Sequence, residues 1–138
     1  NALLSRYRAG RVRPIVAGVA AVRRAAARGP IAIASGSPPQ AIATLLEILR
    51  LDDVVATYVS CDEVPAGKPA PDVYLEACRR IGIDPTRSLA IEDSTNGARS
   101  AKAAGMTVVL VPMPGAHSAI GGAEVADAVV ESLDALPF

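Results

Sequence analysis

Two adjacent carboxylates, Glu92 and Asp93, directly follow the apolar run Leu89-Ala90-Ile91, which has the character of a buried strand. A charged pair at this position contributes little to packing, whereas two carboxylates suit a hard cation such as Mg²⁺. In an open α/β sheet, ligands bind at the carboxyl ends of the strands. We therefore predict that Glu92 and Asp93 are metal ligands. A role for Asp93 as the cap of the next helix is the simpler alternative, but it leaves Glu92 unexplained.

Lys68 is one of only two lysines in a chain that has twelve arginines. It lies in the turn Gly67-Lys68-Pro69-Ala70-Pro71, where prolines make the backbone rigid. A compact ammonium can sit against a phosphoryl oxygen where a forked guanidinium would not fit. We predict that Lys68 contacts a phosphoryl group, and the alternative is a solvated loop lysine. The turn is not a Walker loop, because Pro69 stands where that motif needs serine or threonine.

The segment Ser35-Gly36-Ser37 lies between an apolar run and the helix start Pro38-Pro39. A helix amino terminus with free N–H groups, a glycine and two hydroxyls is a suitable cradle for phosphate. Ser37 is also expected to cap the helix, which is the ordinary role of a serine at this position. His117 is the only histidine, and we expect it to be a solvated bystander.

The elements that must position these residues alternate along the chain. Apolar periodicity and Gly/Pro stops predict helices over 14–28, 38–49, 72–81 and 94–104. Continuous apolar runs predict strands over 31–34, 57–60, 88–91, 107–111 and 128–130. The helix over 72–81 should bury Tyr74, Cys78 and Ile81. Alternating strands and helices with continuous apolar strands predict an α/β fold, a three-layer Rossmann-like parallel sheet with helices on both faces.

Composition limits the possible partners and the compartment. Half of the 138 residues are apolar, and fourteen basic residues balance fourteen acidic ones, so no global field attracts nucleic acid or a membrane surface. No apolar run is long enough to span a bilayer. Cys61 and Cys78 lack metal-type spacing, and we expect both to be reduced thiols of a cytoplasmic protein.

Three segments with these candidate residues occur in a fixed order: Ile33-Ala34-Ser35-Gly36-Ser37-Pro38, Gly67-Lys68-Pro69-Ala70-Pro71-Asp72 and Ile91-Glu92-Asp93-Ser94-Thr95-Asn96-Gly97. They resemble motifs II, III and IV of the haloacid dehalogenase superfamily, and most closely the branch of β-phosphoglucomutase-like phosphatases and mutases. The resemblance covers about residues 14–112. Three concordant motifs in the right order make it specific.

The resemblance implies a Mg²⁺-dependent phosphoric monoester hydrolase that acts through an aspartyl-phosphate on a small phosphorylated metabolite such as a sugar phosphate. Ser35 and Lys68 would be catalytic residues that bind the transferred phosphoryl group, and Gly36 and Ser37 would add backbone donors. Glu92 and Asp93 would position magnesium, directly or through water. These roles match phosphoryl transfer, which depends on positioning and charge neutralisation.

One part of the family pattern is missing. Motif I, an Asp-x-Asp on the first strand, supplies the nucleophile, and no such pair occurs in these 138 residues. We therefore expect residues 1–13 to be a remnant of the cap domain and its linker, and residues 14–138 to be the C-terminal part of the core domain. Without the first strand, the strands that carry Ser35 and Glu92 would stand roughly 10 Å apart. They could pair directly, or another chain could fill the place by self-association.

Three functions remain open at this stage. The leading one is the C-terminal part of a phosphatase whose nucleophile lies upstream, with this chain alone inactive. A shortened homologue that binds a phospholigand or a partner without turnover is the second. A phosphomutase of the β-phosphoglucomutase type is the third. A dehalogenase is less favoured than the phosphatase or the mutase, because the Glu-Asp pair indicates a metal.

Overall fold

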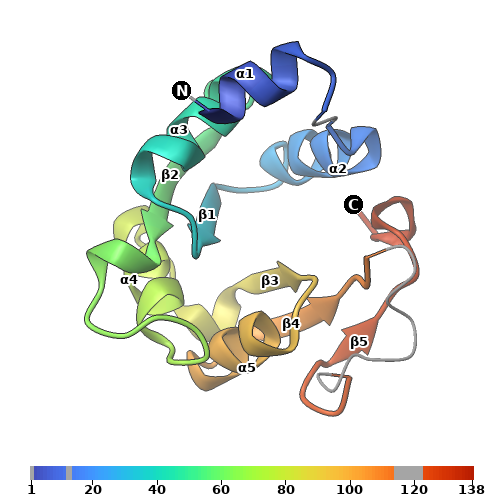
Figure 1. Cartoon of the computed structure of the whole chain (residues 1–138). Coiled ribbons are helices and arrows are strands. Elements are labelled where there is room, and N and C mark those ends of the chain that lie inside the picture. The colour runs from blue at the N-terminus through green and yellow to red at the C-terminus, as the bar shows by residue number, and fades with distance from the viewer. Residues whose placement is uncertain (1, 12–13, 114–122) are drawn as a thin grey trace.

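The computed structural model describes residues 2–11, 14–113 and 123–138, so His117 lies outside the described residues. The helices are α1 (Ala2–Arg8), α2 (Val16–Ala26), α3 (Pro39–Leu49), α4 (Asp72–Ile81) and α5 (Thr95–Ala103) (Figure 1). The strands are β1 (Ile31–Ser35), β2 (Val55–Ser60), β3 (Leu89–Glu92), β4 (Thr107–Leu110) and β5 (Ala128–Val129). Every helix and strand expected from the sequence is present, with ends that differ by a few residues.

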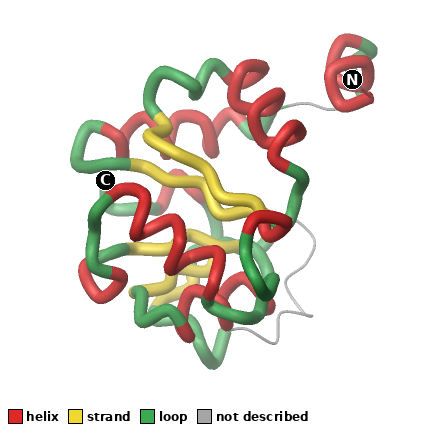
Figure 2. Tube along the Cα trace, turned by 90° about the vertical axis from the view of Figure 1, so that its left-hand side faces the viewer, coloured by secondary structure: helices red, strands yellow, loops and turns green. Residues whose placement is uncertain are grey.

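The strands form two parallel sheets rather than one. β1 pairs with β2, with Ser35 opposite Ser60, and β3, β4 and β5 pair in that order, with Glu92 opposite Leu110. Figure 2 shows the two sets of strands one above the other. Direct pairing of β1 with β3, which the sequence left open, is therefore wrong for the described residues. Within residues 2–11, 14–113 and 123–138, β1 and β3 each keep one edge without a strand neighbour.

Helices cover the two sheets unequally. On β1, Ala32 and Ala34 pack into a core with α4 and α5, whereas Ile33 packs into a second core with α2 and α3. Because successive residues of a strand point to opposite faces, α4 and α5 lie on one face and α2 and α3 on the other. On β3, Ala90 is buried in the first core, but Leu89 and Ile91 are 44% and 37% exposed. The predicted third layer therefore covers β1 and β2 but leaves one face of β3 partly exposed.

The helix that connects the two sheets is α4. It begins after Pro71, and Gly82 ends it with φ +69°, a left-handed conformation that favours glycine. Tyr74 and Cys78 are buried in it as expected, but Ile81 is only half-buried. Both cysteines are free thiols, as the sequence indicated. No helix among the described residues is long and apolar enough to cross a membrane.

Candidate functional site

The residues singled out in the sequence meet at the carboxyl ends of β1 and β3. A cavity of about 470 Å³ opens there. Its lining comprises Ile33, Ala34, Ser35, Gly36, Lys68, Tyr74, Ile91, Glu92, Asp93 and Ser94. Three segments that are far apart in the sequence therefore supply a hydroxyl, an ammonium and two carboxylates to one space. Among the predicted site residues, Ser37 is not part of this lining.

Lys68 joins the two sheets at this end. Its ammonium donates to the backbone carbonyl of Ala34 in β1, with an Nζ–O distance of 3.2 Å, and to Oε1 of Glu92 in β3. The side chains of Lys68 and Glu92 are only 17% and 7% exposed. An ion pair with so little solvent is weakly screened, so each charge depends on the other. Lys68 is therefore not the solvated loop lysine of the alternative interpretation.

Tyr74 completes this ion pair and is a residue that sequence reasoning placed only in the core. Its hydroxyl donates to the same Oε1 of Glu92, and the Lys68 ammonium lies 5.0 Å from the centre of its ring. Burial raises the pKa of the Tyr74 hydroxyl, and the negative charge of Glu92 raises it further, so the group stays a donor at neutral pH. In the sequence, the only indication of a polar role for Tyr74 was the presence of a hydroxyl-bearing side chain on a helix face that is otherwise apolar.

Gly97 makes room for the carboxylate of Glu92. A methyl group added to Gly97, in the first turn of α5, would overlap all three atoms of that carboxylate. The absence of a side chain at Gly97 therefore allows α5 to lie directly against the carboxylate of Glu92. A carboxylate at a helix amino terminus is also favoured by the helix dipole.

Asp93 is exposed at the edge of the cavity. The cap of α5 is Ser94, whose Oγ accepts a hydrogen bond from the N–H of Gly97 at 3.1 Å. The alternative in which Asp93 only caps this helix is therefore wrong. Its carboxylate is available to a ligand in the cavity.

The Ser35-Gly36-Ser37 turn differs in part from the expected cradle. Ser35 and Gly36 line the cavity, and Ser35 Oγ accepts a hydrogen bond from the N–H of Ser37 at 3.1 Å. The carbonyl of Ser37 accepts from Ser60 Oγ at 2.7 Å, which fixes the turn to the end of β2. The predicted capping by Ser37 is wrong, because the N-cap of α3 is Pro38 and the helix has no side-chain cap.

A buried serine connects two of the site segments, and nothing in the sequence pattern pointed to it. Ser100 of α5 is fully buried and donates to the carbonyl of Ala70 at 2.6 Å. This bond fixes the loop that carries Lys68 to the helix that follows Glu92 and Asp93. The relative positions of the ammonium and the carboxylates thus depend on buried hydrogen bonds between neighbouring elements.

The donor set at the cavity fits a hard divalent cation with few protein ligands. No group of three or more His, Cys, Asp or Glu side chains is close enough to hold a metal within the described part of the chain. Mg²⁺ often takes only one or two carboxylates and keeps waters or phosphate oxygens in its other positions. Glu92 and Asp93 satisfy that need, although Oε1 of Glu92 is already engaged by Lys68 and Tyr74.

Comparison with known proteins identifies the class of the chain. Residues 6–105 match the family model described as haloacid dehalogenase-like hydrolase, which spans most of the 138 residues. The chain belongs to this family of hydrolases, as the three sequence segments indicated.

Individual relatives are phosphatases and related proteins. Over 135 residues the chain is 34% identical to a plasmid-borne phosphoglycolate phosphatase of Cupriavidus necator, covering 94% of this chain and 56% of the relative. Over 88 residues it is 36% identical to hexitol phosphatase B of Escherichia coli K12, covering 64% of this chain and 40% of the relative. A mutant of CbbY from Rhodobacter sphaeroides in complex with xylulose-(1,5)bisphosphate superposes with a TM-score of 0.72 at 29% identity, covering 91% of this chain and 56% of that one. The chain thus spans about half the length of these relatives, or less.

Proposed function

We propose that this chain is the C-terminal part of a Mg²⁺-dependent phosphatase that hydrolyses a small phosphorylated metabolite of the sugar-phosphate type. The observation that carries the proposal is the convergence of Ser35, Lys68, Glu92 and Asp93 on one cavity at the carboxyl ends of two parallel strands. Names of relatives support the substrate class, since they include a hexitol phosphatase and a protein in complex with a sugar bisphosphate.

The residues of this chain would bind and orient the phosphoryl group. Ser35 Oγ would donate to one phosphoryl oxygen, and the backbone at Gly36 would approach another, since a side chain is absent there. The Lys68 ammonium, held by Glu92, would neutralise negative charge that accumulates in the transition state. Bound Mg²⁺, held by Asp93 and Glu92, would supply further charge neutralisation for the transferred group.

The nucleophile is proposed to be an aspartate upstream of these 138 residues, which contain no Asp-x-Asp pair. Its carboxylate would attack phosphorus, the substrate alkoxide would leave, and water would then hydrolyse the aspartyl-phosphate to regenerate the carboxylate. The chain alone should therefore not turn over. Self-association that completes the sheet would not change this, because a second copy brings no such pair.

The direct test joins the chain to an upstream segment. A chimera carries the part of hexitol phosphatase B that precedes its matched 88 residues, followed by this chain. We expect Mg²⁺-dependent release of phosphate from sugar or hexitol phosphates by the chimera and none by the chain alone. Turnover by the 138 residues alone contradicts the missing nucleophile. No turnover by a folded chimera would favour the inactive homologue, and isomerised sugar phosphate instead of free phosphate would favour the mutase.

A further inference from the structure

The turn that would receive the phosphoryl group is held by a residue that does not line the site cavity. This residue is Ser60, the last residue of β2, and it is fully buried. Its hydroxyl donates to the backbone carbonyl of Ser37, with an Oγ–O distance of 2.7 Å. The same Oγ accepts a hydrogen bond from the N–H of Asp62 at 3.1 Å. Because a carbonyl can only accept, the single hydroxyl hydrogen of Ser60 is directed at Ser37.

This bond keeps an acceptor away from the site. An anion is bound by N–H and O–H donors, and a carbonyl oxygen that faces it repels it. The carbonyl of Ser37 is engaged by Ser60, and Ser37 is not part of the cavity lining. The N–H of Ser37 donates to Oγ of Ser35, which does line the cavity, at 3.1 Å. With its oxygen accepting from the turn, the Ser35 hydroxyl can direct its own hydrogen to an acceptor in the cavity.

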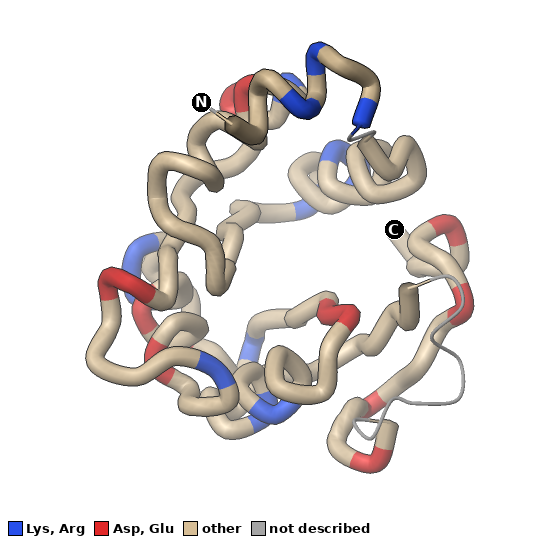
Figure 3. Tube along the Cα trace, in the orientation of Figure 1, with Lys and Arg blue, Asp and Glu red and all other residues tan. Residues whose placement is uncertain are grey.

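Ser60 is itself held by an ion pair at the surface. Its N–H donates to Oε2 of Glu63 at 2.8 Å, and Oε1 of the same carboxylate accepts from Arg80 of α4 at 3.1 Å. Arg80 also donates to the carbonyl of Tyr58 in β2 at 2.7 Å. The bond from Ser60, followed by the bond from Arg80, lowers the pKa of the Glu63 carboxyl, so this group is an acceptor at neutral pH. Figure 3 shows acidic and basic positions next to each other where the end of β2 meets α4.

Helix capping alone does not account for the bond to Ser37. Ser60 is the N-cap of the short 3-10 turn Cys61–Glu63, and a cap has only to accept from an N–H of that turn. The hydroxyl hydrogen goes instead to a segment 23 residues earlier in the chain. Ser37 is exposed, so water could satisfy its carbonyl. The bond therefore fixes the position of the turn and is not needed to satisfy a buried group.

We propose that Ser60 is a positioning residue for phosphoryl binding, which holds the Ser35-Gly36-Ser37 turn with its donors toward the cavity. Ser60 acts through the carbonyl of Ser37 and does not touch the substrate. Glu63 holds Ser60 in turn from the surface. This role rests on the proposed function, since it needs a phosphoryl group to bind at the turn.

The test measures phosphate binding by the 138-residue chain, with inorganic phosphate as the probe. In ¹⁵N-labelled protein, the amide resonances of Gly36 and Ser37 report binding at the turn and give a dissociation constant. Ser60→Ala should raise this constant at least about fivefold, because the ligand must then order a turn that has lost its anchor. Ser60→Thr keeps the hydroxyl and should restore the constant to within about twofold. Ser88→Ala removes a hydroxyl that donates to the carbonyl of Asp84, outside the cavity lining, and should leave the constant unchanged.

Backbone ¹⁵N relaxation of the phosphate-free chain provides a readout that a merely structural role would not move. In Ser60→Ala, the order parameters of Gly36 and Ser37 should fall below about 0.6, whereas those of β4 should stay near about 0.85. A fall in both segments would mean a general loss of structure, and it would overturn the proposal.

The same data separate this inference from the proposed function. Phosphate binding by the unsubstituted chain that Ser60→Ala leaves unchanged would overturn the role of Ser60 alone. An unsubstituted chain whose Gly36 and Ser37 resonances do not respond to phosphate would contradict the phosphoryl site itself, and the role of Ser60 would be lost with it.

A matched pair of surface variants tests the support of Ser60 without a buried change. Glu63→Ala removes the carboxylate that accepts from the N–H of Ser60, and it should raise the phosphate dissociation constant about two- to threefold. Glu76→Ala removes a neighbouring carboxylate that binds Arg79 and Arg80 instead, and it should leave the constant unchanged. Equal effects of the two variants would contradict the path from Glu63 through Ser60 to the turn.

Discussion

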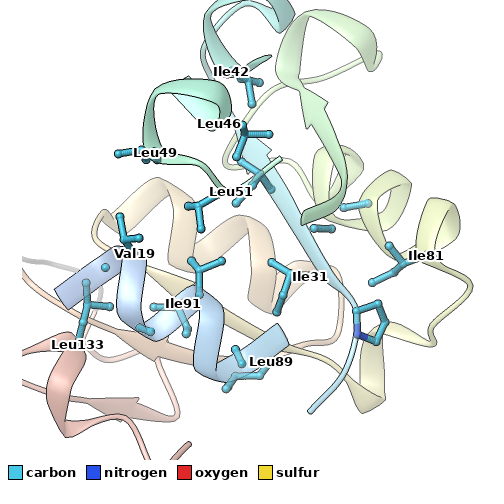
Figure 4. A pocket seen from close by; sticks show the side chains of 18 of the residues that line it. Val19, Ile31, Ile42, Leu46, Leu49, Leu51, Ile81, Leu89, Ile91 and Leu133 are labelled. Atoms are coloured by element: carbon cyan, nitrogen blue, oxygen red, sulfur yellow. The ribbon is translucent and has the colours of Figure 1, made fainter. Parts of the chain in front are cut away.

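The two faces of the sheets differ in whether their hydrophobic core extends from β1 to β3. On the α4 and α5 face, one continuous core includes residues of β1, β2, β3 and β4. On the α2 and α3 face, the core includes residues of β1 and β2 only. The two halves of the molecule are therefore joined by packing on one face. On the other face they are separated by an apolar cavity of about 940 Å³ that residues of β1, β3, α2 and α3 line, here called the apolar groove (Figure 4).

This difference explains why the site residues converge although β1 and β3 belong to separate sheets in the described part of the chain. Lys68 lies just before α4, Tyr74 lies within it, and Glu92 lies shortly before α5. The positions of all three therefore depend on the face whose core is continuous, the α4 and α5 face. The hydrogen bonds of Lys68 and Tyr74 to Glu92 join β3 to the α4 segment, although no described strand lies between β1 and β3. Positioning of these side chains therefore does not require β1 and β3 to pair.

Paired truncations in the two cores should give the largest difference. Leu110 is fully buried in the continuous core, whereas Leu46 lies in the second core and lines the groove. We expect Leu110→Ala to lower the free energy of unfolding by about 4 kcal/mol and Leu46→Ala by about 2 kcal/mol, because a site beside open space loses fewer contacts. Urea unfolding measures both. Equal costs, or the reverse order, would show that the groove face is packed as tightly as the other.

The Lys68–Glu92 pair should show strong coupling in a double-mutant cycle. Lys68→Met and Glu92→Gln should each cost about 3 kcal/mol of unfolding free energy, because each leaves its poorly solvated partner without a counter-charge. The double variant should cost clearly less than the sum of the two single costs. Additive costs in urea unfolding would mean that the ammonium and the carboxylate do not interact as described.

Gly97→Ala tests the space reserved for the carboxylate of Glu92. Alanine normally stabilises a helix interior by about 1 kcal/mol over glycine, but here its methyl group meets Glu92. We expect a net loss of about 1 to 2 kcal/mol of unfolding free energy, since the carboxylate must leave Lys68 and Tyr74. Gly36→Ala is the control, because a methyl group there meets nothing within 4 Å. A stabilising Gly97→Ala would refute the close approach.

The smallest effect should come from Asp127, which lines neither of the two cavities. Hydrogen bonds from Lys102 and from the N–H of Val108 lower the pKa of its carboxyl group below 3.8. Its contribution is therefore complete above the unfolded pKa of 3.8 and fades as the pH falls through the lower folded value. Asp127→Asn should lower the melting temperature slightly at pH 7, and the difference should shrink toward about pH 2. A difference that does not change with pH would contradict the shift.

Local patterns in the sequence predicted the elements and the meeting of the three motifs, because apolar runs and Gly/Pro stops mark parallel strands and their carboxyl ends share one edge. The sequence did not predict what holds the ammonium and the carboxylates together. The bonds of Tyr74 and Ser100 join elements distant in sequence, and their residue types fit ordinary core positions equally well. The N-cap of α5 is Ser94 rather than Asp93. The sequence could not distinguish the two, because both residue types suit a cap and only the backbone geometry selects one of them.

The central claim is that Lys68 belongs to a phosphoryl-transfer site, and the second lysine of the chain supplies a matched control. Both substitutions, Lys68→Met and Lys102→Met, are made in the active chimera, and Mg²⁺-dependent phosphate release is measured under the same conditions. We expect Lys68→Met to lower kcat/KM by about a hundredfold or more. Lys102→Met, which alters an exposed pair with Asp127, should stay within about twofold of the unsubstituted chimera. Equal rates for the two variants would contradict the account.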